Sequence, residues 1–111
     1  LRARLTRPDL TREAVVGLMR DFPRDFEAAG WPASAYRTSK VGLNAITRVL
    51  ARDLRGRVRV NAVCPGWVRT GMGGPNVERS VEVGAASIVA LAASEDATTG
   101  QFFRDGQPIP W

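Results

Sequence analysis

The chain of 111 residues contains no histidine and a single cysteine, Cys64. The absence of histidine excludes catalytic triads that use an imidazole, and it removes the commonest protein ligand of transition metals. One cysteine can form neither an internal disulfide nor a zinc site, and a chain without disulfides fits a reducing compartment. We therefore expect no bound metal and a cytoplasmic location.

Long apolar runs are also missing. No segment approaches the roughly 18 apolar residues of a membrane-spanning helix. The first ten residues, LRARLTRPDL, lack the apolar stretch of a signal peptide. Hydrophobic residues make up 44% of the chain and charged residues 24%, as in folded soluble domains. We expect at most one domain and no membrane partner.

The net charge of +5 raises the possibility of a nucleic-acid-binding protein. The arginines are scattered, acidic residues lie between them, and no run of five like charges occurs. Aromatic residues are not interleaved with the arginines in a way that would stack on bases. This pattern favours an ordinary solvated surface, so we expect no nucleic-acid partner. A basic interaction module without catalysis is the competing interpretation.

Two helical segments are predicted in the first half of the chain. Apolar spacing predicts a helical segment over residues 11–28, capped by Thr11. Pro23 is expected to break this segment, with Asp21 capping a restart. A long amphipathic helix is expected over residues 34–56. Its apolar side is expected to consist of Leu43, Ile46, Leu50 and Leu54. Gly56 is expected to end the helix.

The second half is predicted to begin with a strand over residues 57–64 whose apolar residues alternate until a Pro-Gly pair ends it. A glycine-rich loop over 65–80 and a helix over 81–94 should follow. A short strand over 100–104, a turn at Asp105-Gly106 and a tail are expected to complete the chain. Strands that alternate with long helices are typical of a parallel α/β sheet. Two strands and three helices cannot cover both faces of such a sheet, so the pattern resembles the end of a larger domain.

Tyr36 is the only tyrosine of the chain, and Lys40 is the only lysine among 16 basic residues. Residues four apart on a helix lie on one face, with Cβ atoms roughly 5–6 Å apart. A free phenol has a pKa near 10, and a cation held close lowers that pKa by roughly 1–3 units. The phenol then approaches the range that general acid–base catalysis needs. A lysine supplies this charge as a compact group with three donors, unlike the planar fork of arginine.

The segment NAVCPGWVRTGM, residues 61–72, places a Pro-Gly pair where the predicted strand ends. Ligands of open α/β sheets bind outside the carboxyl ends of the strands. Exposed backbone N–H groups and the hydroxyl of Thr70 could bind a carboxamide or a phosphate there. An ordinary loop between strand and helix is the alternative for this segment taken alone.

Together, YRTSK and NAVCPGWVRT resemble the short-chain dehydrogenase/reductase family, which carries Y-x-x-x-K followed by N-x-x-x-P-G-x-V-x-T. The stretches LTREAVVGLMRDF, GWPASAY and GQFFRDGQPIPW are similar to its monomeric NADPH-dependent carbonyl reductases, and this likeness covers essentially the whole chain. The resemblance implies the C-terminal portion of one domain over residues 1–111. Its fold class is α/β, the C-terminal part of a Rossmann-type doubly wound parallel sheet that lacks its N-terminal nucleotide-binding half.

The resemblance also implies roles for single residues. Tyr36 is the general acid that protonates a ketone or aldehyde oxygen, and Lys40 makes the phenol more acidic and binds the nicotinamide ribose. Hydride comes from NADPH, and Trp67 and Met72 would line the substrate side. Cys64 is favoured as a small buried strand residue, and its reactivity is left open. The implied cofactor-binding residues are Tyr36, Lys40, Pro65, Gly66, Trp67, Val68 and Thr70.

The family's glycine-rich fingerprint and catalytic serine lie upstream of the Tyr-Lys helix, and this sequence contains neither. GMGG, residues 71–74, follows that helix and is no substitute. Ser34 and Ser39 are not where the family places its serine. We therefore expect a fragment or truncated product, inactive alone, and a monomer because residues 11–28 would cover the catalytic helix. A degenerate reductase remnant without catalysis is one alternative, and a ketoacyl reductase of the same family is another. NAD in place of NADP is the alternative for the cofactor.

Overall fold

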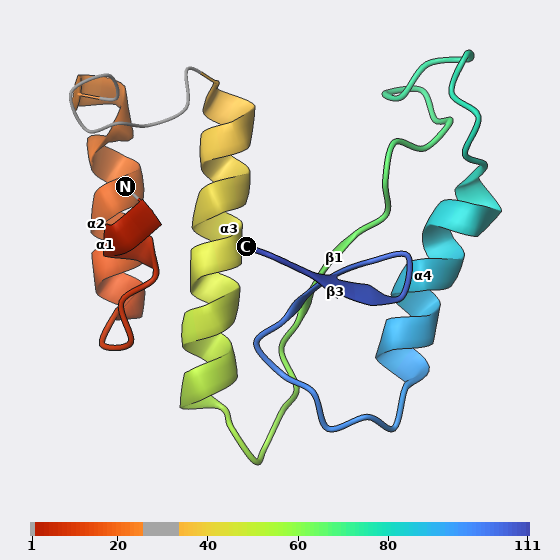
Figure 1. Cartoon of the computed structure of the whole chain (residues 1–111). Helices are drawn as coiled ribbons and strands as arrows, with labels where there is room; N and C mark the ends of the chain where they lie inside the picture. Colours follow the sequence, from red (N-terminus) through yellow and green to blue (C-terminus); the bar gives the residue numbers. More distant parts are fainter. Residues whose placement is uncertain (1, 26–33) are drawn as a thin grey trace.

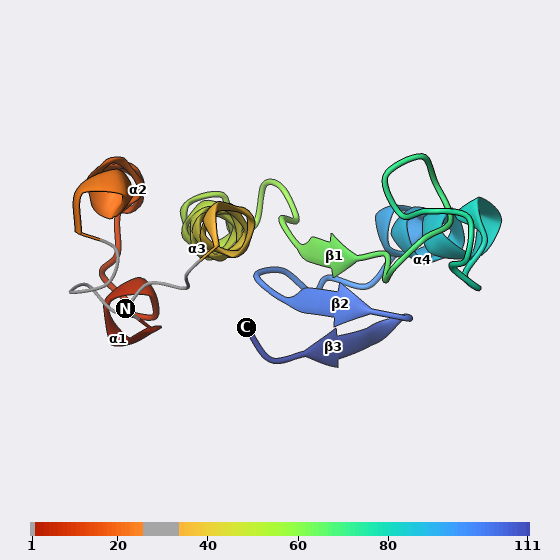
Figure 2. The ribbon, with the colours of Figure 1, turned by 90° about the horizontal axis from the view of Figure 1, so that it is seen from above.

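The structure is a computed structural model that describes residues 2–25 and 34–111 (Figure 1). Three helices, α1 to α3, lie on one side, and a small sheet lies on the other with α4 beside it. Seen from above, these elements stand side by side, and the molecule measures 39 × 38 × 18 Å (Figure 2). The elements in chain order are α1 (Arg2–Leu5), α2 (Arg12–Asp25), α3 (Ala35–Asp53), β1 (Ala62–Cys64), α4 (Val81–Ala93), β2 (Phe102–Arg104) and β3 (Gln107–Ile109).

The helix α2 begins where its cap was predicted, because the hydroxyl of Thr11 accepts a hydrogen bond from the amide of Ala14 at 3.1 Å. The predicted break at Pro23 is wrong, since α2 continues to Asp25 and Asp21 lies inside it rather than capping a restart. Pro23 falls in the final described turn, where the proline removes one backbone bond and leaves the preceding turns intact. Residues 26–28 of the predicted segment lie outside the described residues.

The helix α3 has Ser34 as its N-cap, and the hydroxyl of Ser34 accepts a hydrogen bond from the amide of Arg37 at 3.4 Å. The helix ends at Asp53, before the predicted Gly56, which adopts φ of +79°. The predicted apolar side is also displaced, because Leu43 is 52% exposed. Small residues on a neighbouring face pack inward instead. The buried residues of α3 are Thr38, Gly42, Ala45, Thr47, Val49 and Ala51.

The sheet has the order β1-β2-β3. β1 pairs with β2 in parallel, in the register Ala62 to Phe102, and β2 pairs with β3 antiparallel. The strand predicted over 57–64 is shorter than expected. The amides of Arg57 and Val58 bond to the carbonyl of Leu54 at 2.9 and 3.0 Å, which turns the chain off the end of α3. Val58 is 54% exposed, so it does not share a buried face with the residues of β1.

The chain ends in a hairpin, which the sequence predicted only in part. The strand expected over 100–104 is β2, and the turn expected at Asp105-Gly106 is present with φ of 50° and 75°. The tail was not expected to form a strand, yet Gln107–Ile109 is β3. Pro108 cannot donate to a ladder, and β3 tolerates it because β3 is an edge strand of the described sheet.

The main core of the described residues lies between α1, α2 and α3, and it comprises Leu5, Leu10, Val15, Leu18, Ala45 and Val49. The helix α4, predicted over 81–94, contributes little to a core. Gly84 is its only buried residue, whereas Val83, Ile88 and Val89 are 45–63% exposed. No helix in the described part of the chain has the length and apolar content to cross a membrane.

Candidate active site

Tyr36 and Lys40 lie on one face of α3, at its N-terminal end. The Nζ atom of Lys40 lies 5.4 Å from the centroid of the Tyr36 ring, and the Tyr36 side chain is 68% exposed. Helical spacing brings the two side chains together as the sequence predicted. The arrangement places an ammonium beside a phenol that a molecule in solution can reach.

Neighbouring residues hold this turn of α3 in place. The hydroxyl of Ser39 donates to the carbonyl of Tyr36 at 2.7 Å, and Ser34 caps the helix two residues before Tyr36. Gly42 lies two residues after Lys40 and is packed beneath the side chain of Met19 from α2. Both serines therefore have structural contacts in the first turns of α3.

The glycine-rich loop follows β1 and lies at the same end of the molecule as the N-terminal end of α3 (Figure 1). The chain runs along α3 in one direction and returns along β1 in the other. The N-terminal end of the helix and the carboxyl end of the strand therefore point the same way. Pro65 and Gly66 leave β1 directly after Cys64, and Gly66 adopts φ of +79°, a conformation that favours glycine. The structure places these residues where ligands of α/β sheets bind.

The loop forms its own hydrogen bonds between Trp67 and Gly73. The indole of Trp67 donates to the carbonyl of Gly73 at 2.9 Å. The hydroxyl of Thr70 accepts from the amide of Gly73 at 3.0 Å and donates to the carbonyl of Val68 at 3.4 Å. The Thr70 hydroxyl thus retains one acceptor position for a ligand. The loop is a closed turn that presents apolar groups outward, because Trp67 and Met72 are 73% and 96% exposed.

Val68 points away from this exposed edge and toward α4. A Cβ atom placed on Gly84 would lie 2.6 Å from Cγ2 of Val68, so the bare glycine admits the valine side chain. Any ligand contact of Val68 would therefore come from its backbone. Cys64 is a free thiol at the end of β1, and it is half-buried rather than buried as expected.

Three further polar side chains have contacts that the sequence did not reveal. The side-chain amide of Asn61 donates to the carbonyl of Thr98 at 2.8 Å and accepts from the amide of Gln101 at 3.0 Å, which aligns β1 with β2. Arg79 forms an ion pair with Asp105, with N–O distances of 2.5 and 3.1 Å. The hydrogen bond from Arg79 lowers the pKa of the Asp105 carboxyl below its usual value. No local pattern signals these pairs, because their members lie at least 26 residues apart.

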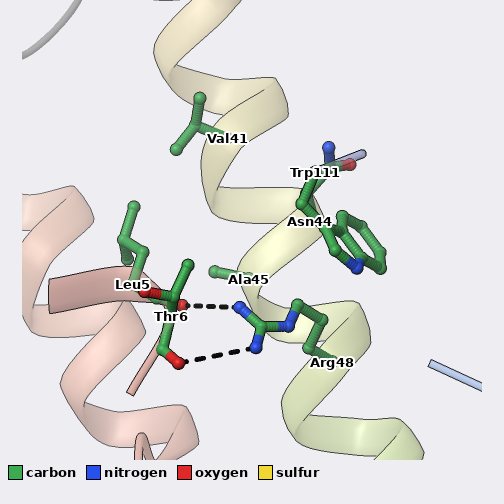
Figure 3. A pocket seen from close by; sticks show the side chains of 7 residues that line it. All are labelled: Leu5, Thr6, Val41, Asn44, Ala45, Arg48 and Trp111. Carbon is green, nitrogen blue, oxygen red and sulfur yellow. Dashed lines mark hydrogen bonds between the residues drawn. The ribbon is translucent and has the colours of Figure 1, made fainter. Parts of the chain in front are cut away.

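A cavity of about 220 Å³ lies elsewhere, between α1, α3 and the end of the chain (Figure 3). The guanidinium of Arg48 crosses its edge and donates to the carbonyls of Leu5 and Thr6 at 3.3 and 3.5 Å. None of the residues that the sequence singled out for catalysis or cofactor binding lines it. Within the described residues, no group of three histidine, cysteine or acidic side chains could hold a metal ion.

Comparison with protein families matches residues 26–101 to the model described as enoyl-(acyl carrier protein) reductase. Carbonyl reductase (NADPH) 1 of Mus musculus is 42% identical over 92% of the chain, and the human protein of the same name is 37% identical. Among solved structures, salutaridine reductase from Papaver somniferum matches 93% of the chain at 38% identity with a TM-score of 0.74. The chain spans 42% of the length of the mouse relative and 37% of the salutaridine reductase chain.

Proposed function

The chain belongs to the short-chain dehydrogenase/reductase family, and from that premise we propose that it supplies the acid–base residues of an NADPH-dependent carbonyl reductase. Its fold class is the predicted one, an incomplete Rossmann-type α/β sheet. The observation that carries the proposal is the contact between Lys40 and Tyr36, the single lysine beside the single tyrosine, on an exposed helical face.

The residues present fit a nicotinamide nucleotide. Lys40 offers three hydrogen-bond donors that ribose hydroxyls can share, and Gly66 lies at the carboxyl end of β1 with φ of +79°. The loop would hold the nucleotide through Pro65, Gly66, Trp67, Val68 and Thr70. When bound, NADPH supplies the hydride that reduces the substrate carbon.

Tyr36 would complete the reduction. As the carbonyl carbon gains the hydride, its oxygen becomes negatively charged, and the phenolic O–H donates its proton to that oxygen. The resulting phenolate is stabilised by the ammonium of Lys40, whose Nζ atom is 5.4 Å from the ring centroid. Solvent can return the proton to Tyr36, because the ring is 68% exposed. The exposed side chains of Trp67 and Met72 would contact the apolar part of a ketone or aldehyde.

Because the chain covers about 42% of the mouse relative, the complete reaction is assigned to this chain joined to a nucleotide-binding half. The sequence contains no glycine-rich fingerprint, so turnover by the 111 residues alone is expected to be negligible. The packing of α2 against α3 supports a monomer, because α2 contacts the helix that would otherwise be free to pair.

The test is a chimera in which the part of mouse carbonyl reductase that precedes the matched segment is joined to Leu1. We expect this chimera to oxidise NADPH in the presence of a small ketone, and the 111-residue chain alone not to do so. NADH in place of NADPH is the control for the cofactor. A folded chimera that consumes neither nucleotide would overturn the proposal. Salt-sensitive binding of the chain to DNA would instead favour a basic interaction module.

A further inference from the structure

Arg79 makes the most enclosed ion pair among the described residues of the loop and the hairpin. Its two terminal nitrogens, Nη1 and Nη2, bond to the two carboxylate oxygens of Asp105 at 2.5 and 3.1 Å. The Arg79 side chain is 24% exposed, although it carries a charge. A bidentate contact of this kind fixes the orientation of the guanidinium as well as its distance from the carboxylate.

The same arginine covers the turn at the end of β1. A Cβ atom placed on Gly66 would lie 2.8 Å from the Nε atom of Arg79 and 3.1 Å from its Cζ atom. The guanidinium therefore packs against the bare backbone of Gly66. The carbonyl of Arg79 also accepts a hydrogen bond from the amide of Arg69 at 2.8 Å, which joins the two ends of the loop.

Strand pairing on both sides of Asp105 fixes the position of this contact. Asp105 occupies the turn between β2 and β3 with φ of 50°, and Arg104 on one side of the turn pairs with Gln107 on the other. β2 is in turn paired with β1 through Cys64 and Arg104. These contacts form a closed series. Gly66 follows β1 and contacts Arg79, Arg79 pairs with Asp105, and Asp105 follows β2, which pairs with β1.

We propose that the Arg79–Asp105 pair is a lock that holds the Pro65–Gly66 turn in its cofactor-binding position. Arg79 is then a positioning residue, which acts through Gly66 rather than by touching substrate. The inference rests on the proposed function for its kinetic consequence, but the restraint on the loop is independent of it. A glycine at φ of +79° has wide conformational freedom, so a restraint from outside the loop has most effect there.

Amide hydrogen exchange of the 111-residue chain tests the restraint directly. Arg79→Gln and Asp105→Asn should each raise exchange at residues 66–74 by about tenfold or more while exchange in α3 is unchanged. Arg79→Lys should give an intermediate increase in exchange, since an ammonium keeps the charge but not the two-point contact of the guanidinium. Arg104→Gln is the matched control, because Arg104 lies 3.8 Å from the same carboxylate, whereas the atoms nearest to a Cβ placed on Gly66 all belong to Arg79. Equal exchange at residues 66–74 in Arg79→Gln, Asp105→Asn and Arg104→Gln would contradict the proposed restraint.

The chimera with the mouse nucleotide-binding half supplies the kinetic readout. Arg79→Gln should raise KM for NADPH about tenfold with kcat within about twofold of the unsubstituted chimera, as expected when the loop that binds the cofactor is less well ordered. Arg104→Gln should change neither. A chimera without turnover would count against the proposed function while leaving the exchange result to decide the restraint. Turnover with unchanged KM in Arg79→Gln would overturn the positioning role alone.

Discussion

At the scale of single residues, the central feature is a phenol with an ammonium 5.4 Å from its ring. The spacing of Tyr36 and Lys40 predicted this contact, because a helix brings residues four apart onto one face. The contact of Arg79 with Asp105 could not be predicted in the same way. Its geometry depends on a hairpin and a loop that meet only after the chain has folded, and nothing in the sequence around either residue specifies that meeting.

Lys40 is expected to act through its charge. In the chimera, Lys40→Met should lower kcat by about 10–10³-fold, because a nearby cation stabilises the phenolate that forms when the proton leaves. Arg37→Met is the matched control, since it removes an exposed positive charge one residue from Tyr36. Steady-state reduction of a small ketone measures both. Equal losses in the two variants would contradict a specific role for the charge beside the Tyr36 ring.

The ion pair of Asp105 predicts a pH effect on stability. Its pKa is lowered in the folded protein, first by the hydrogen bond from Arg79. The pair therefore stabilises the fold fully above the unfolded pKa of about 3.9 and progressively less as the pH falls through the lower folded value. Thermal unfolding between pH 7 and pH 2 should show a smaller acid-induced loss for Asp105→Asn than for the unsubstituted chain. Parallel curves would contradict this assignment.

At the scale of elements, predictions succeeded where local chemistry decides the outcome. The cap at Thr11, the start of α3 near Ser34 and the turn at Asp105 follow from side-chain hydrogen bonds and backbone preferences that the sequence displays. The strand β3 was missed because Pro108 argues against a strand, and only its position at an edge of the sheet makes it acceptable. The buried face of α3 was misplaced because the choice of face depends on α2, which packs over Gly42.

Two helical glycines provide a matched test of how α4 meets the loop. Gly84→Ala should destabilise the chain by about 1–3 kcal/mol, because the added Cβ would lie 2.6 Å from Cγ2 of the stiff Val68 side chain. Gly17→Ala in α2 should stabilise it by about 0.5–1 kcal/mol, because a Cβ there meets no atom within 4 Å. Denaturant unfolding of both variants measures the difference. Stabilisation by Gly84→Ala would show that Val68 does not pack on α4.

At the scale of the whole molecule, the sequence predicted an incomplete Rossmann-type α/β sheet, and the similarity to salutaridine reductase confirms it. The described residues form three strands and a core that lies mainly between helices. The exposed valines and isoleucine of α4 agree with the chain's covering only 42% of the mouse relative, since a longer chain offers more surface to bury them. Sequence alone could not reveal this exposure, because apolar residues on a helix are read as core whichever neighbour covers them.

Removal of the phenolic oxygen of Tyr36 in the chimera tests the proposed proton transfer most directly. Tyr36→Phe removes the phenolic oxygen and keeps the ring, so NADPH binding should persist while the rate of hydride transfer in a single turnover falls. The expected loss is about 10²–10⁴-fold, the contribution of a general acid. NADPH binding, measured through the fluorescence of the nucleotide, shows whether the binding site remains formed. A Tyr36→Phe chimera that reduces the ketone as fast as the unsubstituted chimera would contradict the assignment of Tyr36 as the proton donor.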